Sequence, residues 1–503
     1  MREHMRRVCD EIWVIDLGGE GRGTRKDDNV FAIQTPVCIT VAVRYSSGDR
    51  NVPAAVHYAR VEGTRAQKLD ALEKLETLGG LHFETAPQGW HAAFKPAGTG
   101  DYFGWPLLTD LMPWQTSGCQ IKRTWPIGTD EDVLERRWTA LLASANRADA
   151  LKETRDRTVN SRVASLADDA ILPSLATLPA NSPRPVVRRY GYRSFDRRTV
   201  LADNRLGDYW RASLWQTWSA RQVYLVSMFS IPFGAGPAMT ASAAVVDMHY
   251  FRGSFGGSDL FPLYRDTAAQ QPNLHPQLLA LLEQRYARPV SADDFAAYLY
   301  AVLAQPGFTE RFHDELASKA LHVPLTDDAA LFARAVALGG ELLFLHTYGE
   351  RFADGQQWPA PQVKALKAVS GGALPETFRY DDARQVIVVG DGEFGPVSSA
   401  AWDYEVSGLK VVQSWLGYRM RVRKGKKSSP LDDINPKEWG SEYTSEFLRL
   451  LNLLSRTLEL HPAQAALLDE IVAGPLIAAD ALGPVPEQCR KAPTVGHSGE
   501  LEI

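Results

Sequence analysis

Residues 401–427 read AWDYEVSGLKVVQSWLGYRMRVRKGKK and combine two different patterns. The first half contains Trp402, Tyr404 and Trp415 among aliphatic residues, which predicts a buried, aromatic-rich element. The second half, residues 419–427, has six cations and no acid in nine positions. These cations are Arg419, Arg421, Arg423, Lys424, Lys426 and Lys427. Since a polyanion is the natural partner of such a run, we predict a packed platform that holds a basic tongue, our name for residues 419–427.

A second group of cations lies in residues 184–201, RPVVRRYGYRSFDRRTVL. We use the name arginine cluster for Arg188, Arg189, Arg193, Arg197 and Arg198. Tyr190, Tyr192 and Phe195 alternate with them, and arginine forks beside aromatic rings suit phosphates and base edges. The alternative is a solvated face with internal ion pairs to nearby acids, because most charge runs are solvated. Those acids are Asp196, Asp203 and Asp208.

Length and composition indicate a globular protein with more than one domain. The chain has 503 residues, of which 45% are hydrophobic and 23% charged. Its net charge of -5 does not exclude a nucleic-acid partner, because binding depends on the local field rather than on the total charge.

The cysteines and the N-terminus indicate a cytoplasmic protein. Cys9, Cys38, Cys119 and Cys489 are far apart and form no CxxC pair, which excludes a zinc ribbon and argues against a disulfide framework. No apolar segment follows the N-terminal arginines, and no stretch approaches about eighteen uncharged apolar residues. We therefore expect neither secretion nor a membrane partner.

The first part of the chain has the pattern of an α/β segment. Strands are expected at 11–17, 30–45 and 54–61, followed by an amphipathic helix at 64–78. The glycine-rich turn GGEGRG (18–23) invites comparison with a cofactor-binding loop, but such a turn must open a helix, and a polar segment and a strand follow here. We favour a strand-to-strand loop over a cofactor loop.

The later part of the chain has the pattern of an α+β domain. A Pro- and Ser-containing stretch places a boundary near residue 180, and a β-hairpin is expected to turn at 390–392. Strands are also expected at 222–231 and 241–250. Helices are expected at 130–157, 276–286, 292–304, 307–318, 328–347 and 441–459.

The sequence contains no recognisable catalytic or metal-binding motif. Its eleven histidines are dispersed, and neither an HExxH motif nor a GxxxxGK[ST] loop occurs. Methyl transfer to the amino group of a DNA base needs an Asn/Asp-Pro-Pro-aromatic tetrapeptide that holds the flipped base. The nearest string, residues 434–437 (INPK), lacks the second proline and the aromatic ring. We predict no catalytic, cofactor or metal residue, and the two basic segments remain as the candidate binding site.

The chain resembles the C-terminal part of the Type ISP restriction-modification enzymes. Similar strings recur in the same order and spacing over about residues 11–460. They include VIDLGGEGRGTRKDDNVFAIQTPVCITVAVR (14–44), LTDLMPWQTSG (108–118), YGYRSFDRRTVLADNRL (190–206) and AWDYEVSGLKVVQSWLGYR (401–419). In this family single polypeptides carry nuclease, helicase, adenine methyltransferase and target-recognition parts in that order.

The resemblance implies a division of the chain into four parts. Residues 1–65 would be the last strands of a methyltransferase-like domain, 66–180 a helical and irregular connection with a linker, 181–484 the DNA specificity domain and 485–503 a disordered tail. The S-adenosylmethionine loop and the catalytic tetrapeptide would precede this region. It also places GGEGRG in a late-strand loop, which counts further against a cofactor site there.

Three hypotheses follow. The first is recognition of double-stranded DNA, with methylation and cleavage done by a methyltransferase and helicase-nuclease part encoded upstream. S-adenosylmethionine would then serve the complete enzyme and not this chain alone. The second is adenine-N6 methyltransferase activity after pairing with a separate catalytic half, and the third is a protein-interaction remnant of a truncated gene. For DNA recognition, we expect the aromatics of 401–418 to pack and contacts to begin at Arg419, whereas in the third hypothesis aromatic surfaces would bind another subunit.

Overall fold

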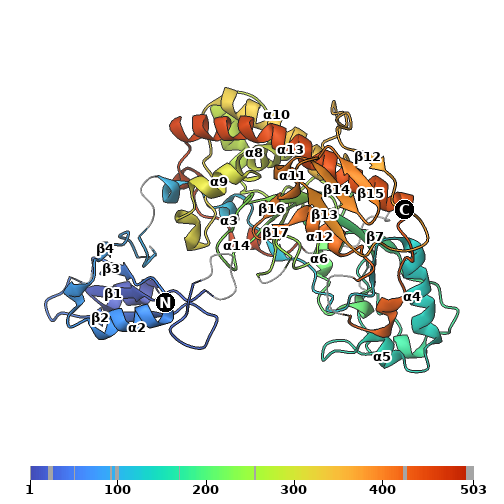
Figure 1. The fold of residues 1–503 in the computed structure, drawn as a ribbon. Helices are drawn as coiled ribbons and strands as arrows, with labels where there is room; N and C mark the ends of the chain where they lie inside the picture. The colour runs from blue at the N-terminus through green and yellow to red at the C-terminus, as the bar shows by residue number, and fades with distance from the viewer. Residues whose placement is uncertain are drawn as a thin grey trace.

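The computed structural model of the chain describes residues 2–20, 27–49, 51–90, 93–96, 101–168, 170–253, 256–422 and 427–493. A small N-terminal unit lies beside a larger body that contains the remaining sheets and helices (Figure 1). The body is a mixed assembly of several small sheets and a group of packed helices, which agrees with the mixed α and β content that the sequence predicts.

The N-terminal unit is a four-stranded sheet of order β2-β1-β3-β4. Its strands are β1 (Glu11–Asp16), β2 (Cys38–Val43), β3 (Ala55–Arg60) and β4 (Glu84–Thr85). The first three lie within the predicted strands. β1 runs parallel to β3 and antiparallel to β2, and α1 (Arg2–Val8) and α2 (Arg65–Glu73) accompany the sheet.

This unit extends beyond the expected boundary at residue 65. Ala86 is buried in the same cluster as Ile12 and Val56, and Phe94 packs against that cluster. Leu72, Leu75 and Phe83 pack around a second small cluster. The paired strand β4 and these contacts therefore join the segment as far as Phe94 to the sheet.

The larger body has one continuous core from Tyr102 to Leu482. The expected boundary near residue 180 does not divide two cores, because Leu175 is fully buried in this one. In addition, β6 (Ile127–Gly128) pairs with β8 (Asp196–Leu201) across the predicted linker. The Pro- and Ser-containing stretch therefore runs along the surface and connects two parts of one domain.

In its described residues the body contains three sheets of three or four strands and a two-stranded sheet of β16 (Glu405–Val406) and β17 (Leu409–Lys410). The first has the order β6-β8-β7, with β7 at Val187–Arg193. The second has the order β10-β9-β11-β5 and consists of β5 (Thr116–Ser117), β9 (Tyr224–Ser227), β10 (Thr240–Ser242) and β11 (Asp259–Pro262). The third has the order β12-β15-β14-β13 and consists of β12 (Lys364–Lys367), β13 (Phe378–Asp381), β14 (Val386–Val389) and β15 (Gly392–Gly395). The β14–β15 turn falls at the predicted position.

Helices α8 (Ala292–Leu303), α10 (Ala329–His346) and α13 (Ser441–Ala473) pack together in the body. α13 runs along one side of the molecule in Figure 1. The sequence predicts its end near residue 459, but the helix continues through Pro462. Pro462 is exposed, so water can satisfy the carbonyl that its ring leaves unpaired, and the buried Leu467, Leu468 and Ile471 hold the last turns in place.

α10 is long and apolar enough to cross a membrane by length and composition alone. In the fold it is a packed helix with charged residues in ion pairs. Arg334 pairs with Glu470 and Glu341 pairs with Arg456, both on α13, while Phe332, Leu342 and Leu343 are buried. These contacts are typical of a core helix of a globular domain.

The expected disorder of residues 485–503 does not hold for the first part of the tail. Residues Glu487–Arg490 form α14. The Arg490 guanidinium donates to the Thr109 carbonyl and pairs with Asp110 at 2.6 Å, and Arg265 donates to the carbonyls of Cys489 and Lys491. Arginine contacts to backbone carbonyls thus anchor a segment whose composition is polar. Residues 494–503 lie outside the described part.

Candidate nucleic-acid interface

The arginine cluster lies on the β7–β8 hairpin. The register pairs Arg189 with Thr199, Tyr190 with Arg198 and Arg193 with Asp196. Tyr190 is completely buried, and Phe195 occupies the turn with a φ of 63°. The hairpin is therefore a core element, and its position decides which guanidinium groups reach solvent.

Asp196 joins the arginine cluster to the basic tongue. Its carboxylate binds Arg198 at 2.9 Å and Arg419 at 2.7 Å, and all three side chains are buried. Burial alone would raise the pKa of Asp196, but the two guanidinium groups outweigh it and hold that pKa below its usual value. Arg419 also donates to the Trp415 carbonyl and lies over the Trp415 ring at 3.6 Å. The start of the tongue is thus fixed to the hairpin by a buried charge pair.

Two further arginines of the cluster are paired inside the protein. Arg193 pairs with Asp247 at 2.8 Å, and the Tyr190 hydroxyl donates a hydrogen bond to the same carboxylate. Burial lowers the pKa of Arg193, but Asp247 and neighbouring tyrosines raise it overall. Arg197 binds Glu350 and Glu446 at 2.9 and 2.8 Å.

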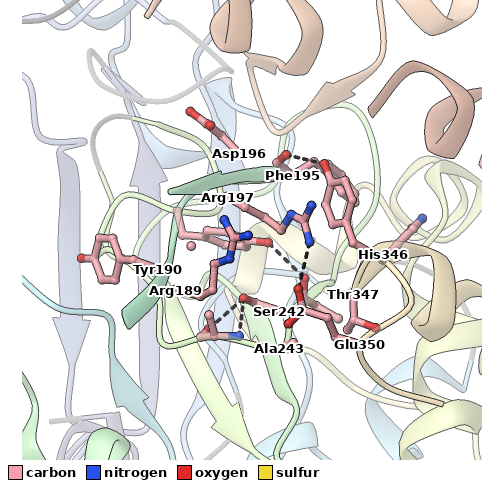
Figure 2. A pocket seen from close by; sticks show the side chains of 15 residues that line it. Arg189, Tyr190, Phe195, Asp196, Arg197, Ser242, Ala243, His346, Thr347 and Glu350 are labelled. Carbon is pink, nitrogen blue, oxygen red and sulfur yellow. Dashed lines mark hydrogen bonds and ion pairs between the residues drawn. The ribbon is translucent and has the colours of Figure 1, made fainter. Parts of the chain in front are cut away.

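Figure 2 shows the guanidinium of Arg197 turned toward Glu350. The same guanidinium lies 3.7 Å from the centre of the Tyr348 ring. The pocket drawn there has a volume of only about 20 Å³. This is room for about one water molecule, so the pocket is a packing gap and not a ligand site.

Four of the arginines predicted to contact DNA are held in ion pairs within the protein. Arg193, Arg197, Arg198 and Arg419 have side chains that are 3–16% exposed and already bind carboxylates. For Arg193, Arg198 and Arg419, moving the guanidinium to a phosphate would leave a buried aspartate, Asp247 or Asp196, without that partner, which is costly. The interpretation as internal ion pairs holds for these four, although the partners are Asp196, Asp247, Glu350 and Glu446. Asp203 and Asp208 bind Arg205, Arg123 and Lys122 instead.

The other predicted contacts differ in exposure. Arg189 is exposed and forms no ion pair within the described ranges, and Arg188 is half-buried with its guanidinium 5.8 Å from the Trp218 ring. Arg421 and Lys427 have side chains 65% and 71% exposed. Arg423, Lys424 and Lys426 lie outside the described residues.

The platform under the tongue consists of α11 (Ser399–Trp402), β16 (Glu405–Val406), β17 (Leu409–Lys410) and α12 (Val411–Gly417). Tyr404 and Trp415 are 6% and 2% exposed, which confirms that they pack. Trp402 is half-buried and stacks on Tyr380. The Trp415 ring stacks on Phe447 of α13 at 5.0 Å.

A cleft of about 720 Å³ lies where the hairpin meets the tongue. Tyr192, Arg198 and Tyr418 line it, with the two tyrosine rings edge to face at 5.2 Å and Arg198 over both. Residues 373–374 and 432–437 also border it. Among the described residues, three exposed cations line this cleft, namely Arg421, Lys427 and Lys437.

Two cleft residues were not predicted from the sequence. Lys437 is exposed and has no ion-pair partner among the described residues; its only sequence signal was its position ten residues after the tongue. Arg137 lies in α4 (Glu131–Ala143), where the charged pattern suggests a surface cation. It is buried and donates to the carbonyls of Trp125, Ile127 and Ile434. Arg137 thus fixes the segment that carries Lys437.

The first two glycines of the glycine-rich turn after β1 already use their backbone amides within the protein. Gly18 and Gly19 have φ values of 61° and 98°, and their amides donate to the carboxylates of Asp16 and Asp27. The amides that would have to hold a ligand are therefore in use, and Asp27 binds the buried Lys68 at 2.7 Å. Residues 21–26 lie outside the described part. In the described residues no group of three or more His, Cys, Asp or Glu side chains could hold a metal ion.

Comparison with models of protein families shows which family the chain belongs to. The profile of the Type ISP C-terminal specificity domain matches residues 110–450, two thirds of the sequence. The chain belongs to this family. The matched region contains the arginine cluster, the tongue and the cleft, and its start agrees better with the observed single core than with a boundary near residue 180.

Solved structures with a fold like that of this specificity domain include three large proteins. A nuclease-deletion mutant of the Type ISP restriction-modification enzyme LlaGI, in complex with a DNA substrate mimic, has a TM-score of 0.58 and 16% identity, covering 92% of this chain and 37% of its own. The ATP-dependent Type ISP enzyme LlaBIII, bound to DNA, has a TM-score of 0.60 and 16% identity, with coverages of 92% and 31%. DrdV in a complex with DNA has a TM-score of 0.57 and 17% identity, and the match covers 93% of this chain and 48% of DrdV.

The chain thus spans less than half the length of each of these proteins. The identities are low, so the likeness concerns the fold. No curated protein matches the sequence.

Proposed function

We propose that this specificity domain recognises double-stranded DNA for a Type ISP-like restriction-modification system. The observation that carries the proposal is the cleft, at which two basic segments far apart in the sequence meet. Membership of the specificity-domain family and the DNA-bound state of the LlaGI and LlaBIII structures support it.

In this proposal the exposed cations position the duplex and the buried arginines position the cations. Arg421, Lys427 and Lys437 would contact phosphates, which sets register without reading sequence. Asp196 holds Arg198 and Arg419, and so fixes the start of the tongue relative to the hairpin. Base reading would come from side chains that enter a groove beside these contacts.

Methylation and cleavage would be carried out by other parts of the system. Two observations support this proposal: the sequence has no Asn/Asp-Pro-Pro-aromatic tetrapeptide, and the amides of Gly18 and Gly19 already donate to Asp16 and Asp27. We therefore propose that a methyltransferase and helicase-nuclease part binds S-adenosylmethionine and performs adenine-N6 methylation and cleavage in the cytoplasm.

Fluorescence anisotropy with labelled duplexes tests the binding proposal. Replacing Arg421, Lys427 and Lys437 together with alanine should weaken binding and reduce the slope of log K against log salt by about three, since each lost phosphate contact removes about one unit. Replacing Arg285, Arg311 and Arg334, which are exposed cations on other helices, is the matched control. Equal effects of both triple substitutions would contradict an interface at the cleft.

Incubation of the purified chain with duplex DNA and labelled S-adenosylmethionine tests the division of labour. The proposal predicts no methyl transfer by the chain alone. Transfer without an added partner would overturn it.

A second candidate function is adenine methylation after pairing with a separate catalytic half. The observation that favours it is an exposed apolar edge of the described N-terminal sheet. β2 is the edge strand, and its Ile39 and Val41 side chains are 41% and 38% exposed. Phe31 and Ile33, just before it, are 60% and 50% exposed. An open apolar edge is suited to pairing with further strands. Co-expression with a neighbouring gene product that carries the missing tetrapeptide should yield a complex, and Val41→Lys should prevent it.

A further inference from the structure

The two exposed tongue cations that the structure describes are both held by carboxylates at the cleft. Arg421 binds Glu376 with an Nη1 to Oε1 distance of 2.5 Å, and Lys427 binds Asp433. Glu376 belongs to the segment between β12 and β13, whereas Asp433 ends the short helix η6 (Pro430–Asp433). The backbone amide of Arg421 also donates to the Pro375 carbonyl, which keeps the tongue beside Glu376. Two separate segments thus each supply an acid to the tongue.

Among the residues that the structure describes, neither acid has another structural task. Neighbouring Asp432 caps η6 by accepting from the Ser428 and Ser429 amides and the Ser428 hydroxyl. In contrast, within the described residues the carboxylates of Glu376 and Asp433 bond only to the two tongue cations. All four side chains are 62–71% exposed. Exposed ion pairs of this kind are weak and can exchange partners.

We infer that Glu376 and Asp433 compete with DNA phosphate for Arg421 and Lys427, and so suppress binding to non-target duplex. The inference rests on the proposed DNA recognition. A phosphate that binds either cation must share it with a carboxylate or displace that carboxylate, and in both cases the acid lies near the phosphate as a like charge. A duplex held by backbone contacts alone has little to offset this cost, whereas a target duplex also gains contacts to its bases.

The test is the affinity of the full chain for a random-sequence duplex at low salt. Glu376→Gln and Asp433→Asn keep the size of each side chain and remove its charge. Each should tighten binding about threefold to fivefold, because an exposed pair of this kind is weak. Glu470→Gln is the matched control, since Glu470 is an exposed acid paired with Arg334 away from the cleft, and it should change the affinity by less than about twofold.

A second arm shows whether the gain depends on the tongue. In an Arg421→Ala background, Glu376→Gln should produce a clearly smaller gain than in the wild-type chain, because the cation for which Glu376 competes is missing. An equal gain in affinity in both backgrounds would contradict the inference. So would a Glu376→Gln variant that binds the duplex no more tightly than the Glu470→Gln control does. If the wild-type chain binds no duplex at low salt, both this inference and the proposed function fail; if it binds but the acid variants are unchanged, only the inference fails.

Discussion

Asp196 is the residue on which the geometry of the interface depends most. Its single carboxylate binds the guanidinium groups of both Arg198 and Arg419, and all three side chains are buried. Removing one member of a buried ionic network leaves charges without compensation in a low-dielectric interior. The network therefore explains why two distant basic segments keep a fixed relation.

Asp196→Asn should lower the free energy of unfolding by about 3 kcal/mol or more, because asparagine cannot offset two buried guanidinium charges. Urea denaturation measures this change. Asp403→Asn removes a carboxylate that is 58% exposed and 3.8 Å from Lys410, and should change stability by less than about 0.5 kcal/mol. Similar losses for both variants would contradict a structural role for the buried network.

Local sequence patterns predicted more of the elements than of the site. The strands at 11–16 and 55–60 and helices α8 and α10 follow from periodicity, which depends on neighbouring residues only. The bond from Arg419 to Asp196 joins residues 223 positions apart, and no local pattern distinguishes this arginine from Arg421. Tertiary burial decides which cation is internal, so the cluster was predicted but its division into buried and exposed members was not.

At the scale of elements, the packing of α8 against α10 depends on Gly339. A Cβ atom there would lie 1.8 Å from the Ala297 carbonyl oxygen, whereas nothing lies within 4 Å of the same position on Gly340. Gly339→Ala should destabilise the protein by about 1–3 kcal/mol, because the helices must separate. Gly340→Ala should be neutral or stabilise by up to about 1 kcal/mol, since alanine favours a helix. Thermal unfolding of the two variants compares them directly, and equal shifts would refute the close helix contact.

The junction of α8, α10 and α13 contains a buried histidine that predicts a pH dependence. His346 shares hydrogen bonds with the Tyr300 hydroxyl at 2.5 Å and the Thr457 hydroxyl at 2.8 Å. Burial, together with nearby His461, lowers the pKa of His346 to about 3. The unfolded chain therefore binds a proton below about pH 6.5 that the folded protein does not bind until about pH 3.

Stability should consequently fall as the pH decreases from about 6.5 toward 3, with a contribution from His346 of about 1.4 kcal/mol per pH unit. His346→Gln removes the titrating ring and should make this slope shallower by that amount, whatever its effect on stability at neutral pH. Urea denaturation at a series of pH values measures the slope. Identical slopes in both proteins would show that His346 is not held neutral.

At the scale of the whole molecule, one continuous core contains residues from both sides of the domain boundary that the sequence pattern predicts near residue 180. Trp125 and Trp138 from the first part and Trp415 from the last are buried in that core. A Pro- and Ser-containing stretch is a valid sign of surface chain, but it does not reveal whether the segments on both sides share a core. The cleft depends on this union, because Arg137 from before the stretch fixes residues 434–435 after it.

The central claim is that duplex DNA lies over the cleft. Site-specific photocrosslinking tests it most directly. A photoreactive side chain in place of Val422, which is 83% exposed at the cleft, should crosslink to bound duplex, whereas the same group in place of Glu470 on α13 should not. Crosslinks from position 470 with none from position 422, at a concentration where the duplex is bound, would contradict the account.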